Sequence, residues 1–284
     1  MPTLHKRFPA NSSGRDFIVG DLHGCLDLLQ VQLDRIRFDT TRDRLFSVGD
    51  LIDRGPDSMG CLRLLREPWF HAVRGNHEGM LIDYASPVGL PYAYGGPAEL
   101  FFANGGRWVM DLGKSDQDEL WDDLVPRVAK LPYVITVGEG PAQFHVAHAE
   151  LMTGRVDGVD TRSNRADLGK KQVLTDAMIN DEVLATMIEP ITWGRRLIKK
   201  ASDSKASEVD TPYGKLAVSH KPWHPGLSLT YVGHTPVKGM VLHASHLFID
   251  RGAYTRRPGE LLAGAGSAEM RRTTRAVSGQ INFV

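Results

Sequence analysis

The chain has 284 residues, long enough to bury a core of its own, and 34 lysines and arginines balance 34 aspartates and glutamates. A net charge of zero gives no general attraction for nucleic acid or for an anionic membrane, so neither is expected as a partner. No apolar run reaches the length of a membrane span, and the basic N-terminus lacks the apolar segment of a signal peptide. Cys25 and Cys61 are predicted to be buried free thiols, which suits a reducing cytoplasm.

The first third of the chain alternates short apolar runs with amphipathic segments, a pattern typical of a doubly wound α/β sheet. Residues 1–15 contain Pro9 and an Asn-Ser-Ser-Gly cluster, and they are predicted to form a loose arm. Strands are predicted at residues 17–20, 44–48 and 69–73, and helices at residues 25–38 and 58–66.

The remaining two thirds of the chain are predicted to begin with helices and to contain more strands toward the C-terminus. Residues 80–130 are mostly helical in pattern and predict a cap, while residues 199–210 have the polar composition of a surface loop. Because no internal repeat or linker is found, residues 1–284 are predicted to form a single domain. Helices are predicted at residues 80–85, 98–112, 116–130 and 175–188, and strands at residues 133–137, 143–147, 229–232, 241–249 and 280–284.

Several of the predicted strands end in small clusters of Gly, Asp, Asn and His. In open α/β sheets the ligand lies outside the carboxyl ends of the strands, so these clusters are expected to meet around one crevice. The clusters read GDLHG (20–24), GDLIDRG (49–55), RGNHE (74–78), HAE (148–150) and GHTP (233–236).

These clusters offer oxygen and nitrogen ligands for metal ions but no thiolate. Asp21 and His23 are two residues apart, so both side chains can reach one ion at a strand end. Asp50 has two carboxylate oxygens and can bridge two ions, which would activate a shared water as hydroxide. Such a set favours two ions of Mn, Fe, Zn, Ni or Co in an open site. The predicted ligands are Asp21, His23, Asp50, Asn76, His148 and His234.

Cationic and acid–base residues flank the predicted ligands. Arg54 and Arg74 are expected to point into the same crevice, where guanidinium groups pair bidentately with phosphate oxygens. The side chain of His77 should leave the chain on a different face from Asn76, where it can protonate a leaving alkoxide. Asp53 is the expected partner that orients this imidazole. Together these residues predict a two-metal phosphoester hydrolase.

The ordered series of motifs resembles the PPP-type metallophosphoesterases, in particular bacterial and phage serine/threonine protein phosphatases of the lambda phosphatase kind. The resemblance spans roughly residues 17–254. It implies an α/β protein of the calcineurin-like metallophosphoesterase fold, with two mixed β-sheets packed as a sandwich and flanked by helices. It also implies a dinuclear metal site at the strand ends, commonly filled by manganese.

The resemblance further implies a role for each motif residue. It places Asp21, His23 and Asp50 on one ion, and it matches Arg54, Arg74 and His77 to phosphate-binding and catalytic positions, with Asp53 as the partner of the histidine. A later arginine of the family follows a tryptophan, and Arg195 in ITWGRR is its predicted equivalent. The ligands that the resemblance assigns to the second ion are Asp50, Asn76, His148 and His234.

Some alternatives stay open at the level of sequence. His145 lies on the same strand as His148 and could be mistaken for the ligand, and Arg196 rivals Arg195. Arg251 occupies a position where the resembled family usually has a small residue, so it either faces solvent or adds a cation near the site.

The function predicted first is the hydrolysis of phosphoserine or phosphothreonine in a phosphoprotein or phosphopeptide. The alternative is a symmetrical dinucleoside tetraphosphatase or another small-molecule phosphoesterase, but the second motif of those tetraphosphatases typically lacks the aspartate found here as Asp53. A third possibility is a catalytically silent binding protein, which the cost of burying so many carboxylates and imidazoles without metal disfavours.

Overall fold

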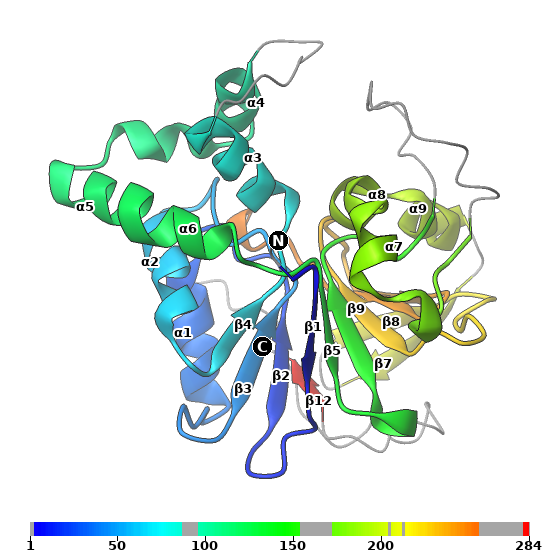
Figure 1. Cartoon of the computed structure of the whole chain (residues 1–284). Helices are drawn as coiled ribbons and strands as arrows, with labels where there is room; N and C mark the ends of the chain where they lie inside the picture. The colour runs from blue at the N-terminus through cyan, green and yellow to red at the C-terminus, as the bar shows by residue number, and fades with distance from the viewer. Residues whose placement is uncertain are drawn as a thin grey trace.

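Two β-sheets lie face to face at the centre of the molecule, which was determined as a computed structural model (Figure 1). The structure describes residues 3–86, 96–153, 172–203, 206–211 and 214–255, and the backbone of residues 281–283. The strands are β1 (His5–Phe8), β2 (Asp16–Val19), β3 (Arg44–Ser47), β4 (Phe70–Ala72), β5 (Val134–Val137), β6 (Phe144–Ala147), β7 (Ser207–Thr211), β8 (Gly214–Val218), β9 (Leu229–Val232), β10 (Met240–His243), β11 (His246–Phe248) and β12 (Ile281–Phe283). The larger sheet has the order β1-β5-β6-β9-β11-β10-β8-β7, and the smaller sheet has the order β12-β2-β3-β4.

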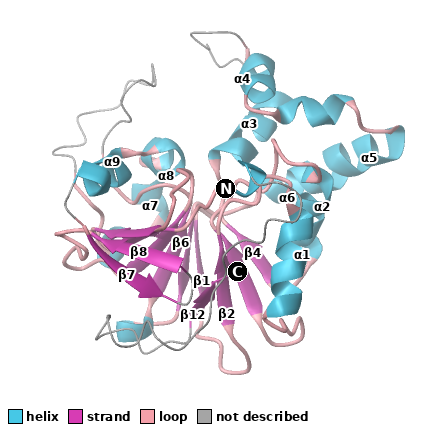
Figure 2. Cartoon of the chain, turned by 180° about the vertical axis from the view of Figure 1, so that it is seen from behind, coloured by secondary structure: helices cyan, strands magenta, loops and turns pink. Residues whose placement is uncertain are grey.

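Helices cover the outer face of each sheet and make the protein four layers thick (Figures 1 and 2). Within the described ranges, every helix is too short or too polar to cross a lipid bilayer. The α-helices are α1 (Leu26–Arg35), α2 (Ser58–Arg63), α3 (Asn76–Ala85), α4 (Pro97–Ala103), α5 (Lys114–Glu119), α6 (Val125–Val128), α7 (Asp181–Ala185), α8 (Ile188–Trp193) and α9 (Arg196–Asp203). Short 3-10 turns lie at η1 (Leu64–Arg66), η2 (Gly106–Met110), η4 (Gly140–Ala142), η5 (Asp176–Met178) and η6 (Ala253–Thr255), and a π turn at η3 (Leu120–Leu124).

Strands β2, β3 and β4 of the smaller sheet are buried on both faces. Successive side chains of a strand point to opposite faces, so Phe17 packs against the helices of the first half while Ile18 packs against the larger sheet. Leu45 and Phe46 divide in the same way between these two cores. The all-apolar runs in the sequence are therefore explained by burial on both sides, as is usual for parallel strands.

The topology brings the carboxyl ends of particular strands to one edge. Strands β2, β3 and β4 are parallel neighbours, and so are β6 and β9 in the other sheet. The loops that follow these five strands carry the five sequence motifs. The crevice expected at the strand ends thus lies where the two sheets meet.

The predicted loose arm is wrong for the segment His5–Phe8. This segment is strand β1, which runs parallel to β5 with His5 opposite Val134. This strand has no apolar pattern in the sequence, because a strand at the edge of a sheet can carry charged residues. Its conformation depends on pairing with β5. Pro9 follows its last residue.

The predicted surface loop at residues 199–210 is also wrong. It contains the end of α9 and most of β7, which pairs antiparallel with the unpredicted strand β8. The strand predicted at residues 241–249 is a hairpin of β10 and β11 that turns at Ala244 and Ser245, both with positive φ. The smaller sheet is not mixed, since its pairings among the described strands are all parallel.

The remaining helix and strand predictions largely match the structure. Helices α3 to α6 fill the region predicted as a helical cap, although the helix predicted at residues 116–130 is interrupted by the π turn just before Pro126. Proline cannot donate a backbone hydrogen bond, which accounts for an irregularity at this point. The terminal strand predicted at residues 280–284 is β12, next to β2.

Candidate active site

Five loops from two sheets meet at one edge of the sandwich. His23 donates its backbone N–H to the carbonyl of Asp50 at 2.8 Å, and Gly233 donates to the carbonyl of His148 at 2.8 Å. The side chains predicted as metal ligands and acid–base residues are all buried there: Asp21, His23, Asp50, Asp53, Asn76, His77, His148 and His234.

The first group of facing donor atoms joins Asn76, His148 and His234. The Asn76 Oδ1 atom lies 3.0 Å from His148 Nε2 and 3.0 Å from His234 Nδ1, and these two nitrogens are 3.2 Å apart. His148 donates from Nδ1 to the Val48 carbonyl at 2.8 Å, because a carbonyl can only accept, so its Nε2 carries a lone pair. Burial lowers the pKa of both histidines, which favours neutral rings. Lone pairs that face one another in this way fit a metal cation between them.

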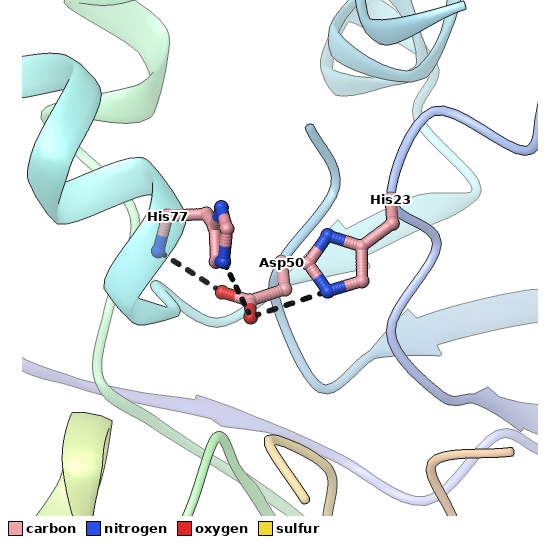
Figure 3. A group of neighbouring side chains, drawn as sticks. All are labelled: His23, Asp50 and His77. Atoms are coloured by element: carbon pink, nitrogen blue, oxygen red, sulfur yellow. Dashed lines mark hydrogen bonds and ion pairs between the residues drawn. The ribbon is translucent and has the colours of Figure 1, made fainter. Parts of the chain in front are cut away.

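The second group joins His23, Asp50 and His77, which approach one another in Figure 3. Asp50 Oδ2 lies 3.7 Å from His23 Nε2 and 3.8 Å from His77 Nε2. The other oxygen, Oδ1, is 3.4 Å from His148 Nε2 in the first group. Burial alone would raise the pKa of Asp50, but His148, His77 and His23 together hold it well below its usual range. Asp50 is therefore an ionised carboxylate shared by both groups.

Asp21 lies beside these groups rather than inside either. Its Oδ2 atom accepts a hydrogen bond from the backbone of His234 at 2.9 Å, and His77 stands in the second group where Asp21 was expected. A side chain at Gly233 would come within 1.9 Å of Asp21 Oδ1, so glycine is required there by close approach. The role of Asp21 as a metal ligand stays a prediction.

Asp21, Glu78 and Asp250 add buried carboxyl groups to those of Asp50 and Asp53. Burial raises the pKa of Asp21 well above its ordinary value, that of Glu78 to about 7 and that of Asp250 to about 6, and the Asp50 charge adds to each shift. Buried carboxylates are costly unless they are paired or bind metal. The oxygen and nitrogen donors and the charge of Asp50 therefore fit divalent cations.

His77, Asp53 and Trp108 form a hydrogen-bonded chain. His77 Nδ1 lies 2.5 Å from Asp53 Oδ2, and Trp108 donates from Nε1 to Asp53 Oδ1 at 2.7 Å. The His77 Nε2 atom is buried and has no hydrogen-bond partner among the residues that the structure describes. Burial lowers the pKa of His77, but Asp50 and Asp53 outweigh this effect and raise it. Sequence reasoning missed Trp108, which belongs to no motif and reads as an ordinary apolar residue of the cap.

The structure separates the predicted arginines. Arg54 is exposed and donates to His23 Nε2 at 2.8 Å, with its guanidinium carbon 4.7 Å from the centre of the Tyr254 ring. Arg74 instead donates to the Ala129 carbonyl at 2.5 Å and to the Tyr133 hydroxyl at 3.2 Å. These contacts tie Arg74 to the end of α6, and its phosphate role stays a prediction.

The structure also distinguishes Arg195 from Arg196. After burial, the positive charge of Arg195 is among the causes that lower the pKa of His148 and His234. Arg196 is instead among the charges that offset the effect of burial on the pKa of Glu150. The charge of Arg195 thus acts on these two histidines, and that of Arg196 acts on Glu150.

Arg251 and the decoy His145 also have defined places. Arg251 is half-buried and lines a small cavity of about 40 Å³ together with Asp21. His145 lies away from the donor groups, hydrogen-bonded to Thr136 at 2.8 Å and to Asp176 at 2.9 Å. The choice of His148 over His145 therefore agrees with the geometry.

The loops at the site hold unusual backbone conformations. His23, Asp50, Asp53, Arg54 and His234 all have φ between 45° and 73°, a region that non-glycine residues seldom adopt. Such strain persists only where surrounding contacts hold it, and it is concentrated at functional sites.

The sequence also matches a known family. A family model described as calcineurin-like phosphoesterase matches residues 17–179, more than half of the chain, and the chain belongs to this family. The family and the fold implied by the motifs are thereby confirmed. Members of this family use divalent metals, in agreement with the His and Asp groups described above.

Individual relatives carry two kinds of name. Serine/threonine-protein phosphatase 2 of Escherichia coli (strain K12) is 38% identical over 151 residues, which cover 53% of this chain and 65% of that protein. The symmetrical bis(5'-nucleosyl)-tetraphosphatase of Actinobacillus succinogenes is 50% identical over 71 residues, 24% of this chain and 26% of that protein. A solved protein serine/threonine phosphatase from Saccharomyces cerevisiae is 14% identical, covering 88% of this chain and 71% of that chain, with a TM-score of 0.45. The chain thus matches just under two thirds of the length of the Escherichia coli relative.

The shared position of Asp50 leads to a direct prediction about metal binding. Asp50→Asn removes the charge and one acceptor oxygen, so metal affinity should fall by more than about tenfold, and activity should fall with it. Metal analysis after dialysis against manganese measures the effect. Asp27→Asn, at an exposed aspartate of α1, is the matched control and should keep its metal. Normal metal content in the Asp50→Asn protein would contradict the assignment.

Proposed function

We propose that the chain hydrolyses phosphomonoesters of serine and threonine in phosphoproteins or phosphopeptides. The observation that carries this proposal is the buried pair of His77 and Asp53, 2.5 Å apart, beside the shared carboxylate of Asp50. A phosphomonoesterase that acts on an alcohol needs a proton donor for the leaving oxygen, and this pair supplies one.

Two divalent ions, which we propose to be manganese, would be held by the donor groups around Asp50. We assign Asp21, His23 and Asp50 to one ion, and Asp50, Asn76, His148 and His234 to the other. Bound there, the ions would activate a water as the nucleophile and neutralise phosphate charge. We also propose that the protein works in the cytoplasm, since Cys25 and Cys61 are buried free thiols in the structure.

The exposed arginines would bind the phosphoryl group. Arg54 contacts the donor groups directly, and the charge of Arg195 acts on His148 and His234. Guanidinium groups stabilise charge that develops on phosphoryl oxygens. Arg54 donates to His23 Nε2, so it already reaches the side chain that would hold one ion. Arg74 is the third arginine that we propose to bind phosphate, and it would exchange its hydrogen bond to the Ala129 carbonyl for one to the substrate.

His77 would act as the general acid. Asp53 fixes the ring by a hydrogen bond and is itself held by Trp108, and the Nε2 atom, which has no hydrogen-bond partner among the described residues, would donate a proton to the leaving alkoxide. The carboxylate of Asp53 favours the protonated ring and stabilises its orientation. Trp108 in turn satisfies the second oxygen of this buried carboxylate.

Hydrolysis of symmetrical dinucleoside tetraphosphates is the second candidate function. It is favoured by the 50% identity to the tetraphosphatase of Actinobacillus succinogenes, although that match covers only 71 residues. Asp53 favours the first candidate, because the resembled tetraphosphatases typically lack an aspartate at this position. A silent binding protein is disfavoured by the cost of the carboxyl groups buried at the site.

A steady-state comparison with manganese present tests the substrate class. Phosphoserine and phosphothreonine peptides and an aryl phosphate should give higher kcat/KM than diadenosine tetraphosphate. We expect a difference of at least about tenfold, because the site is proposed to act on a monoester dianion. The reverse ranking would reject the phosphoprotein proposal and favour the small-molecule alternative.

The role of His77 can be tested by the leaving group. His77→Asn should keep its metal but lose about a hundredfold in kcat on phosphoserine peptides, and far less on aryl phosphates, which leave without a proton. His220→Asn, at an exposed histidine, serves as the control. An equal loss on both kinds of substrate would contradict the assignment of His77 as a general acid.

A further inference from the structure

Two motifs of the site end in a buried glutamate two residues after a predicted ligand. Glu78 follows Asn76, and Glu150 follows His148. Their exposed fractions are 0% and 1%. A buried carboxylate needs strong hydrogen bonds, so the partners of each glutamate show what it does.

Glu78 holds the loop that carries Asp50. Its Oε2 atom accepts from the backbone of Asp50 at 2.9 Å and of Gly75 at 2.8 Å, and its Oε1 atom accepts from Leu51 at 2.7 Å. The shared carboxylate of Asp50 therefore extends from a backbone that another motif fixes. Glu78 is thus a buried glutamate of one motif that fixes the backbone of another.

Glu150 holds a different segment in the same way. Its Oε1 atom accepts from the backbone of Arg196 at 3.2 Å, and its Oε2 atom accepts from Leu197 at 2.8 Å. These are free N–H groups at the start of α9, immediately after Arg195. The approach is close, since a side chain at Gly194 would come within 2.3 Å of Glu150 Cγ.

The segment before Arg195 is also joined to the site. Ala149 donates its backbone N–H to the carbonyl of Ile191 at 2.7 Å, and the ring of Trp193 lies 5.9 Å from the ring of His234. Arg195 is exposed, and its side chain forms no hydrogen bond or ion pair with the residues that the structure describes, while its backbone carbonyl accepts from Lys199 at 3.2 Å. The point from which this side chain extends is therefore set by the backbone, and Glu150 fixes the backbone that follows it.

We propose that Glu150 is a positioning residue that holds Arg195 toward the phosphoryl group, as Glu78 holds Asp50 toward the metal ions. The proposal rests on the proposed function, which gives Arg195 its phosphate. Both oxygens of the carboxylate matter, because one acceptor oxygen is needed for each of two N–H groups. Glutamine supplies one such oxygen and places its own N–H₂ group against the other donor.

The test measures the binding of inorganic phosphate to manganese-loaded protein by isothermal titration calorimetry. Arg195→Ala should raise the Kd for phosphate by about tenfold or more, the loss expected for a charge-assisted contact. Glu150→Ala should raise it by a similar factor at unchanged metal content. The double variant should bind no more weakly than Arg195→Ala alone, because both substitutions remove the same contact.

A purely structural role for Glu150 would give different results. The proposal is overturned if Glu150→Ala binds phosphate as the unaltered protein does, or if its effect persists in full in the Arg195→Ala background. Should Glu150→Ala fail to fold, Glu150→Gln must weaken phosphate binding in the same direction by a smaller factor, and unchanged binding overturns the proposal. Glu182→Ala, at an exposed glutamate of α7, is the matched control.

Turnover of phosphopeptide by the unaltered protein separates this proposal from the proposed function. If the peptide is hydrolysed but Arg195→Ala binds phosphate normally, the positioning role fails and the proposed function stands. If the peptide is not hydrolysed, the proposed function fails, whereas coupled losses of phosphate binding would still support the positioning role.

Discussion

The structure of the site depends on one buried carboxylate that serves two groups of ligands. Asp50 extends one oxygen toward His148 and the other toward His23 and His77, and these histidines favour its ionised form. His23, His77 and His148 follow strands β2, β4 and β6, which belong to the two different sheets. The surroundings of the carboxylate are therefore complete only when both sheets are in place.

The polypeptide around Asp50 is held by hydrogen bonds from outside its own loop. Positive φ values at Asp50 and His234 would be unfavourable in isolation, and each residue is fixed by a carboxylate from another motif, Glu78 or Asp21. A carboxylate that accepts several backbone N–H groups is a rigid support, so functional side chains can stay in place before substrate arrives. Glu150 extends the same principle to the start of α9.

The sequence predicted the parts of the fold that depend on local pattern. Apolar runs followed by Asp, His and Asn identified the strand ends, since a parallel strand that is buried on both faces consists mainly of apolar residues. Strand β1 was missed because its partner β5 lies far away in the sequence. A loop was predicted at residues 199–210 because the end of α9 and strand β7 are polar. A signal for α9 was present in Leu197, Ile198 and Ala201, which are buried at helical spacing. Trp108 has no such signal, because its partner Asp53 is 55 residues distant.

The central claim is that Asp50 is shared by two metal ions. Anomalous diffraction at the manganese absorption edge, from crystals grown with manganese, tests it most directly. Two peaks are expected, one near each oxygen of the Asp50 carboxylate, about 3.5–4 Å apart. A single peak, or peaks away from Asp50, would contradict it.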